Sequence, residues 1–138
     1  MKVELQRVDD AFHFKAVGSA GVAIDIDANA ASGGKDAGAR PMELLLMGLG
    51  SCSAIDIIII LKKQQQQIDD FKIVIDGERY EGETPSVFKS IRVHYILKGK
   101  IEPSKVQRAI DLSFEKYCSV AAILYKTATI EHSFEIIQ

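Results

Sequence analysis

The order of apolar patterns along the chain predicts an α+β fold. Apolar and polar residues alternate over the first thirty residues and again over 71–98, which is the period of half-buried strands. Two other stretches, beginning at Pro41 and Pro103, have helical spacing instead. The resulting order, β-β-β-α-β-β-α-α-β, keeps strands in runs and so excludes a doubly wound parallel sheet. With 138 residues, positions 1–138 are expected to form a single domain.

The first thirty residues predict a meander of three short antiparallel strands. Leu5, Phe14 and Ile24 belong to three alternating segments, with turn signals at residues 9–10 and 18–21 between them. We expect each strand to be buried on one face. Residues 28–40 are small and polar, which is typical of a surface loop able to move or to cross to a neighbouring copy.

Residues 41–63 predict one long helix, because Pro41 suits a first helical turn and no further proline follows in the segment. The stretch 44–61 is apolar enough to raise a transmembrane alternative. Asp56 near its centre argues against that alternative, since a charge at mid-bilayer is costly. We therefore expect a central helix buried on nearly every side. Gly48 and Gly50 would mark a close backbone approach or a bend.

A helix that is apolar all round needs neighbours on every face, and the chain offers only two other helical pieces. A second copy would complete the cover, so the sequence predicts a symmetric homodimer with this helix near the interface.

The remaining elements follow from the same periodicities. Strands are expected over 71–80, 87–98 and 129–137, and helices over 103–118 and 119–126. One face of the strand over 87–98 carries Val87, Ile91, Val93, Tyr95 and Leu97. The helix that begins at Pro103 has an apolar stripe of Val106, Ile110, Phe114 and Tyr117.

Composition excludes several classes of protein. Seventeen Lys and Arg against nineteen Asp and Glu give a net charge of −2, without the basic footprint that nucleic acid or an anionic membrane requires. The charged N-terminal residues do not resemble a secretory signal, so we expect a cytoplasmic protein. His13, His94 and His132 are widely spaced and predict no metal site, and a serine hydrolase is disfavoured because no GxSxG segment occurs.

The two cysteines, Cys52 and Cys118, form no CxxC pair and so indicate neither a zinc site nor a disulfide scaffold. They are either buried apolar residues or a redox pair. Small neighbours around Cys52, including Gly50 and Ser53, leave room for a molecule to reach the sulfur. Cys118 lies at a helix boundary, where proximity to a helix N-terminus lowers a thiol pKa.

The segments PMELLLMGLGSCSAIDIII and EKYCSVAAIL, with one cysteine each, resemble the OsmC/Ohr family of osmotically inducible and organic hydroperoxide resistance proteins. The resemblance covers essentially the whole chain and is closest to an uncharacterised OsmC-like bacterial branch with CSAID and EKYCSV segments. It implies an intertwined homodimer in which antiparallel sheets flank central buried helices, with active sites at the interface.

The resemblance also implies an activity in oxidative-stress defence. In the better-known branches a peroxidatic thiolate, matching Cys52, reduces an organic hydroperoxide, and a second thiol, matching Cys118, resolves it as a disulfide. A protein-bound dihydrolipoyl group usually supplies the electrons, and no metal, flavin or other cofactor is required. This order of events is that of the general thiol oxidation ladder.

The chain departs from the peroxidase branches at two places. Those branches have a glutamate directly after the motif proline, where this chain has Met42, with Glu43 one residue later. They also place an arginine in the N-terminal strands, where only Arg7 occurs and residues 11–27 have none. At about 100° per residue, position 43 falls roughly 180° from Cys52 around a straight helix. Arg40 could pair with Glu43 and replace the missing arginine; alternatively, Glu43 caps the helix and Arg40 is solvated.

Asp56 lies four residues after Cys52, on the same helix face, where its charge would raise a thiol pKa. We therefore expect a basic partner, either within the chain or across the dimer. The candidates within the chain are Lys62, Lys63, Arg108 and Lys116.

Two alternatives to a peroxidase stay open at this point. One is a non-peroxidase dimer that binds a small apolar or thiol-reactive ligand, or acts as a redox sensor. The other is a structural stress protein with inert thiols.

Overall fold

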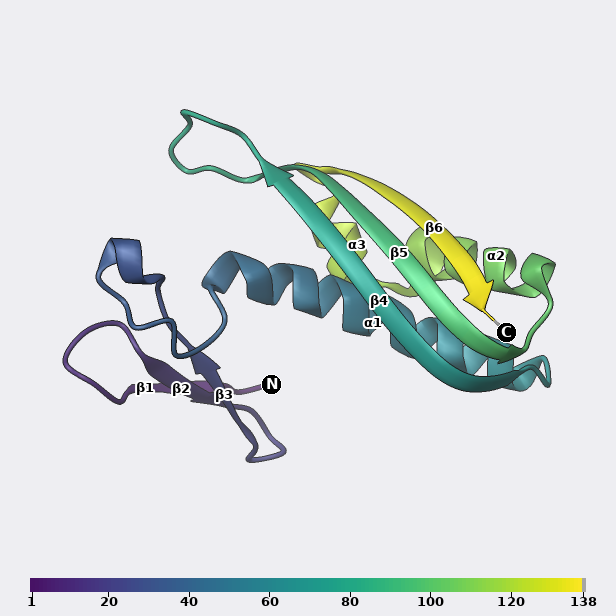
Figure 1. Ribbon diagram of the computed structural model, residues 1–138, viewed down its shortest axis with the longest axis horizontal. Coiled ribbons are helices and arrows are strands. Elements are labelled where there is room, and N and C mark those ends of the chain that lie inside the picture. Colours follow the sequence, from purple (N-terminus) through teal and green to yellow (C-terminus); the bar gives the residue numbers. More distant parts are fainter. Residues whose placement is uncertain (138) are drawn as a thin grey trace. The chain divides into compact units, whose positions relative to one another are not determined.

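The computed structural model describes residues 1–137 and divides the chain into two compact units, Met1–Leu45 and a second that begins at Leu46. The order of strands and helices is the one that the sequence predicts (Figure 1). The strands are β1 (Glu4–Arg7), β2 (Phe14–Val17), β3 (Ala23–Ile26), β4 (Gln67–Arg79), β5 (Phe88–Lys100) and β6 (Thr129–Ile137). The helices are α1 (Pro41–Lys63), α2 (Pro103–Leu112) and α3 (Ser119–Leu124).

The N-terminal unit contains the predicted antiparallel meander, in the order β1-β2-β3. Leu5, Ala16 and Ile24 are register partners and therefore share one face of this sheet. The predicted burial of that face is wrong for the single chain, because Leu5 is 56% exposed and Ile24 54% exposed. Ala16 is the buried member of the face. A three-stranded sheet of such short strands has no second apolar layer of its own to cover it.

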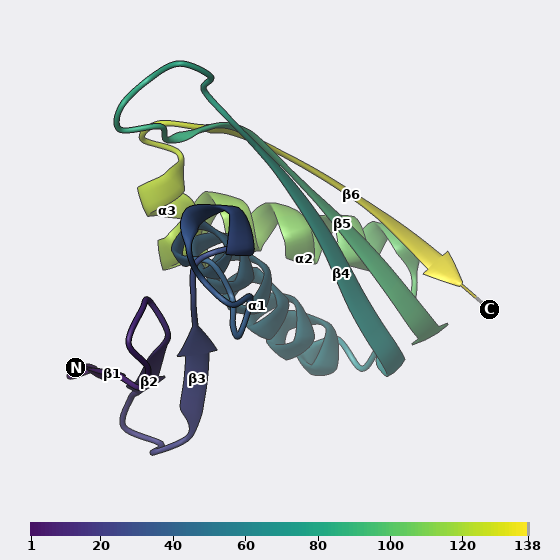
Figure 2. The same ribbon diagram turned by 60° about the vertical axis from the view of Figure 1, so that its left-hand side comes forward.

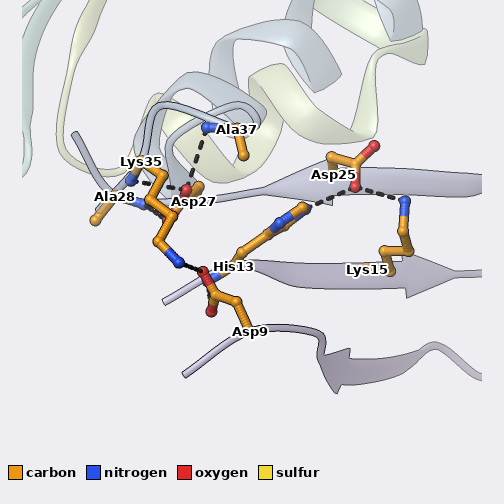
Figure 3. A network of polar contacts seen from close by, with 8 residues as sticks. All are labelled: Asp9, His13, Lys15, Asp25, Asp27, Ala28, Lys35 and Ala37. Atoms are coloured by element: carbon orange, nitrogen blue, oxygen red, sulfur yellow. Dashed lines mark hydrogen bonds and ion pairs between the residues drawn. The ribbon is translucent and has the colours of Figure 1, made fainter. Parts of the chain in front are cut away.

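Polar contacts organise the loop that follows β3 (Figure 3). The buried Asp27 carboxylate accepts hydrogen bonds from the backbone N–H groups of Ala28 at 2.7 Å and of Lys35 and Ala37 at 3.1 Å. Across the sheet, His13 and Lys15 both reach Asp25 at 2.8 Å. The loop predicted over 28–40 is thus closed onto a single carboxylate.

The C-terminal unit contains a sheet of order β4-β5-β6, in which β4 and β5 are antiparallel and β5 and β6 are parallel. The expectation of purely antiparallel sheets is therefore wrong. The reason is the connection: the chain leaves β5, passes through α2 and α3, and returns to the opposite end of the sheet before it enters β6 (Figure 1).

The helices of the C-terminal unit cover one face of this sheet, as both ribbon views show (Figures 1 and 2). On β5 the predicted core face is confirmed for four residues, whereas Val87 precedes the strand and is half-buried. The core between helices and sheet includes Leu49, Ile57, Leu61, Ile91, Val93, Tyr95, Leu97, Val106, Ile110 and Phe114. Tyr117 is 50% exposed, contrary to the predicted stripe, because α2 widens into a π-helical turn over Ser113–Tyr117 that changes the angular spacing.

Helix α1 has the predicted bounds, but one chain does not bury it on every side. Its buried face carries Leu49, Gly50, Ser53, Ala54, Ile57 and Leu61. The opposite stripe of Met47, Ile55, Ile58 and Ile59 is exposed. By length and composition alone α1 also meets the test for a membrane span, which core helices of soluble proteins pass as well.

The two glycines of α1 differ in their surroundings. A Cβ atom on Gly50 would lie 2.5 Å from Ile75 Cδ1, so the predicted close approach to the sheet is confirmed there. A Cβ atom on Gly48 would lie 3.9 Å from Val120, which is ordinary van der Waals contact.

Candidate functional site

The two cysteines lie near one another in the C-terminal unit. Cys52 is in the middle of α1 and is partly exposed, whereas Cys118 follows the π-helical turn and is 4% exposed. The two are close enough for the Cys52 thiol to influence the pKa of Cys118. Both are free thiols in this structure. Residues that are 66 positions apart in sequence thus form one site.

The backbone around Cys118 has a specific local cause. Its N–H donates to the Ser113 carbonyl at 2.7 Å, which closes the wide turn Ser113–Tyr117 and ends the helical course of α2. The Cys118 Sγ atom then accepts from the Ala121 N–H at 3.4 Å and caps α3. The thiol therefore sits between two short helical segments, with its backbone and its sulfur both engaged.

The sequence predicts a lowered pKa for Cys118, whereas the structure gives a raised one. Burial raises it, and the neighbouring Cys52 thiol and Asp56 carboxylate raise it further, to about 11. The Ala121 N–H acts in the lowering direction, as a helix N-terminus should, but burial outweighs it. At neutral pH Cys118 is accordingly a protonated thiol.

Asp56 has a different partner from the predicted one. Its Oδ2 atom accepts a hydrogen bond from the Ser113 hydroxyl at 2.9 Å. Within residues 1–137 it forms no salt bridge with a lysine or an arginine. The predicted basic partner within the chain is therefore wrong, while a cation from a second copy stays a prediction.

A buried hydroxyl pair lies beneath the helix that carries Cys52. The Ser53 hydroxyl donates to the Gly50 carbonyl at 3.1 Å and is 2.5 Å from the Tyr95 hydroxyl on β5. Burial raises the pKa of Tyr95 far above its usual range, and the Asp56 carboxylate and, once ionised, the Cys118 thiolate act in the same direction. Tyr95 therefore stays a neutral phenol and links α1 to β5 through Ser53, the residue after Cys52.

Arg40 and Glu43 lie in the N-terminal unit, at the start of α1. The Arg40 backbone N–H donates to Glu43 Oε1 at 2.8 Å, and the Arg40 guanidinium pairs with Asp36 at 2.5 Å and with Glu43 at 3.9 Å. The predicted ion pair and the alternative capping role of Glu43 are thus both present. Arg7 is the register partner of Phe14, which itself pairs with Ile26, so it shares the apolar face of the N-terminal sheet.

A pocket of about 350 Å³ opens beside Asp56 in the C-terminal unit. Its lining is mainly apolar, from Ile59 and Ile60 of α1 and Leu112 of α2, with Lys63 and Tyr117 among its other residues. A small, largely apolar molecule would fit such a cavity one helical turn beyond Cys52.

Sequence reasoning identified the two cysteines and Asp56 but missed Ser113. A serine five residues before a cysteine matches no helical or strand spacing, and only the π-helical turn gives that spacing a meaning. Tyr95 was expected in the core, yet nothing in the pattern assigned a partner to its hydroxyl. Among residues 1–137, no three His, Cys, Asp or Glu side chains are grouped so as to hold a metal ion.

The fold and the paired thiols together define the chain as an OsmC-like α+β protein. Its sequence matches the OsmC-like protein family over residues 33–133, which is most of the chain. The chain therefore belongs to the OsmC-like family, and the predicted resemblance is confirmed.

Three known proteins illustrate this similarity. Protein YhfA of Escherichia coli K12 is 45% identical over 103 residues, which cover 74% of this chain and 76% of YhfA. The crystal structure of a hypothetical protein from Aquifex aeolicus VF5 is 37% identical, with a TM-score of 0.85 over 99% of this chain and 95% of that one. The organic hydroperoxide resistance protein OhrB of Bacillus subtilis shares the fold at 23% identity, with a TM-score of 0.64 over 97% and 96%.

Proposed function

We propose that this protein is a thiol-dependent peroxidase that reduces organic hydroperoxides and so protects the cell against oxidative stress. The observation that carries the proposal is the adjacency of a partly exposed thiol, Cys52, and a buried thiol, Cys118. Membership of a family that includes organic hydroperoxide resistance proteins supports it.

The exposure of Cys52 and the burial of Cys118 support a separate role for each cysteine. Cys52 is open to substrate and attacks the peroxide: its sulfur bonds to one oxygen, the O–O bond breaks, and the alkoxide leaves as an alcohol after taking a proton. Cys118, protonated and buried, then attacks the Cys52 sulfenic acid. The new disulfide forms as the S–O bond breaks, and the hydroxyl departs with the Cys118 proton as water. An external dithiol, for which a dihydrolipoyl-bearing protein is the proposed source, reopens the disulfide.

We include Arg40 and Glu43 in the catalytic set, as an ion pair that orients and polarises the hydroperoxide in place of the family's usual Arg and Glu positions. Their pairing supports this assignment. Glu43 faces away from Cys52 of its own chain on the continuous helix α1, so the proposal is that the pair acts at Cys52 of the second copy in the dimer. Arg40→Ala should lower the rate of Cys52 oxidation by about a hundredfold, as loss of one charge-stabilising group does in other enzymes. Arg7→Ala is the matched control, and the reverse ranking of the two variants would transfer the role to Arg7.

The proposed assembly is an intertwined homodimer of single OsmC-like domains in the cytoplasm. The exposed apolar stripe of α1 and the uncovered face of the N-terminal sheet are surfaces that a second copy would bury. From the family resemblance we propose that the active sites lie at the interface of this dimer. Neither nucleic acid nor membrane is a proposed partner.

The decisive experiment exposes the reduced protein briefly to one equivalent of cumene hydroperoxide and measures intact and peptide masses. Wild type should lose two hydrogens as the disulfide forms, and Cys118→Ser should accumulate a sulfenic acid that dimedone traps. Cys52→Ser should not react, and cumyl alcohol in place of the hydroperoxide is the chemical control. Unchanged thiols in all three proteins would refute the peroxidase.

The pocket beside Asp56 favours one alternative function. If the thiols do not react with hydroperoxides, this cavity supports a dimer that binds a small apolar or thiol-reactive ligand, with the cysteines as a slower redox sensor. Native mass spectrometry of the protein purified without denaturant would then reveal such a ligand.

A further inference from the structure

The only hydrogen bond recorded for the Asp56 carboxylate within the described chain is with Ser113, and it links the two elements that carry the cysteines. We propose that Asp56 and Ser113 form a positioning pair that holds Cys118 against Cys52 and so determines how readily the two thiols join in a disulfide. The proposal rests on the redox pair of the proposed function and adds two residues that do not themselves react.

Spacing along the chain ties each member of the pair to one cysteine. Asp56 is four residues after Cys52 on the continuous helix α1, so the two side chains project from the same face. Ser113 begins the π-helical turn that ends at Cys118, and its carbonyl accepts the Cys118 N–H at 2.7 Å. A movement of Ser113 is therefore transmitted directly to the backbone of Cys118.

The bond itself has the features of a structural constraint. Ser113 is completely buried, and its hydroxyl donates to Asp56 Oδ2 at 2.9 Å. Hydrogen bonds to a charged group are stronger than those between neutral groups, and leaving one partner buried and unpaired is costly. Lys63 lines the same pocket as Asp56 but forms no ion pair with it in the described chain. The serine is thus the group that fixes this carboxylate against the π-helical turn that follows α2.

The chemistry of the two cysteines makes such positioning useful. A disulfide requires the two Cβ atoms within about 3.5–4.5 Å and a narrow range of torsion angles. A π-helical turn is an uncommon and easily altered backbone form, so it needs an external anchor to keep Cys118 in that range. In the resolving step Cys118 attacks the Cys52 sulfenic acid, and the Cys118 proton passes to the departing hydroxyl. A second hydroperoxide competes with this step, because it can overoxidise the Cys52 sulfenic acid. Disulfide formation is the faster reaction only if the two sulfurs already face each other.

The test is the equilibrium between dithiol and disulfide forms in glutathione buffers at pH 7, which needs no peroxide. Ser113→Ala and Asp56→Ala should each lower the equilibrium constant for disulfide formation by about tenfold, and the double variant by no more than either alone. Ser113→Thr keeps the hydroxyl and should stay within about twofold of wild type. Asp56→Asn keeps an acceptor oxygen but loses the charge, so its equilibrium constant should fall between those of wild type and Asp56→Ala. At this pH, far below the pKa of Cys118, the charge lost in Asp56→Asn does not change the protonation of that thiol.

Ser133→Ala is the control for the loss of a serine hydroxyl. It removes an exposed hydroxyl on β6 whose one hydrogen bond within residues 1–137 is with His94. Circular dichroism and urea unfolding identify any variant that fails to fold, and the two conservative variants keep the test valid if an alanine variant does. An unchanged equilibrium in Ser113→Ala, or additive losses in the double variant, would overturn the positioning pair.

Failure of the proposed function has a different signature. In that case wild-type Cys52 is inert to cumene hydroperoxide, whatever the glutathione series shows. If the proposed function holds and the inference fails, Ser113→Ala forms its disulfide as fast and as completely as wild type after peroxide treatment. If both hold, Ser113→Ala oxidises at Cys52 at the wild-type rate but accumulates sulfenic and then sulfinic acid.

Discussion

The two units of the chain use different interactions to fix their structure. In the N-terminal unit, the Asp27 carboxylate accepts hydrogen bonds from backbone N–H groups and the Asp25 carboxylate accepts them from side chains. The apolar face of the sheet is largely exposed. In the C-terminal unit, the long strands and three helical segments enclose a continuous apolar core, and most of the polar contacts lie on its exposed surface, with the Ser53–Tyr95 hydroxyl pair as a buried exception. The C-terminal unit is thus fixed mainly by apolar packing, whereas polar contacts fix the loop of the N-terminal unit. A second copy that covers the apolar face of the N-terminal sheet stays a proposal.

The largest expected effect concerns the exposed apolar stripe of α1. Ile58→Glu places a charge in this stripe, where the side chain of Ile58 is 42% exposed in the single chain. If a second copy covers the stripe, the buried charge should weaken the dimer by at least about a hundredfold. Light scattering coupled to gel filtration measures the change. Gln107→Glu adds the same charge on the exposed face of α2 and should leave the dimer intact; equal behaviour of both variants would argue against this interface.

The next effect isolates the N-terminal unit. Asp27→Ala removes the acceptor of three backbone N–H groups, so amide hydrogen exchange over residues 28–37 should rise by at least about tenfold, while the C-terminal core stays protected. Asp10→Ala, which removes only an exposed ion pair with Lys35, is the control. Uniform acceleration across both units would show that their structures are coupled.

A pH series tests the burial of Cys118. Burial raises its folded-state pKa from 9.0 to about 11, so alkylation of Cys118 by iodoacetamide should rise about tenfold per pH unit until about pH 11. The raised pKa also affects stability, because the folded state favours the protonated thiol. The contribution of Cys118 to the free energy of unfolding is therefore complete below pH 9 and is lost as the pH rises through 11. The same peptide in urea-unfolded protein should level off near pH 9, and identical curves would contradict the raised pKa.

The sequence predicts much of this structure because the informative patterns are local. Periodicity set the strand and helix order, and Pro41 set the start of α1. Periodicity could not predict the parallel pairing of β5 with β6, because the pairing depends on where the crossover returns the chain. It also could not predict the exposure of Leu5 and Ile24, because that depends on what covers the N-terminal sheet. Ser113 was missed for a related reason: its role comes from a local widening of the helix, which no average helical period describes.

The smallest expected effect compares two glycines of one helix and tests how tightly the C-terminal core is packed. Gly48→Ala should stabilise the protein by up to about 1 kcal/mol, because alanine is the better helix former and the new methyl group would meet Val120 at 3.9 Å. Gly50→Ala gains the same propensity, but its methyl group would lie 2.5 Å from Ile75 Cδ1, so that side chain must shift. Since overpacking costs about 1–3 kcal/mol, the net change should be destabilising. Urea unfolding midpoints at an unchanged slope measure both values. If the two variants shifted the urea midpoint by the same amount and in the same direction, the contact between α1 and β4 would be loose enough to accommodate a methyl group. The core of the C-terminal unit would then be less constrained than the polar loop of the N-terminal unit.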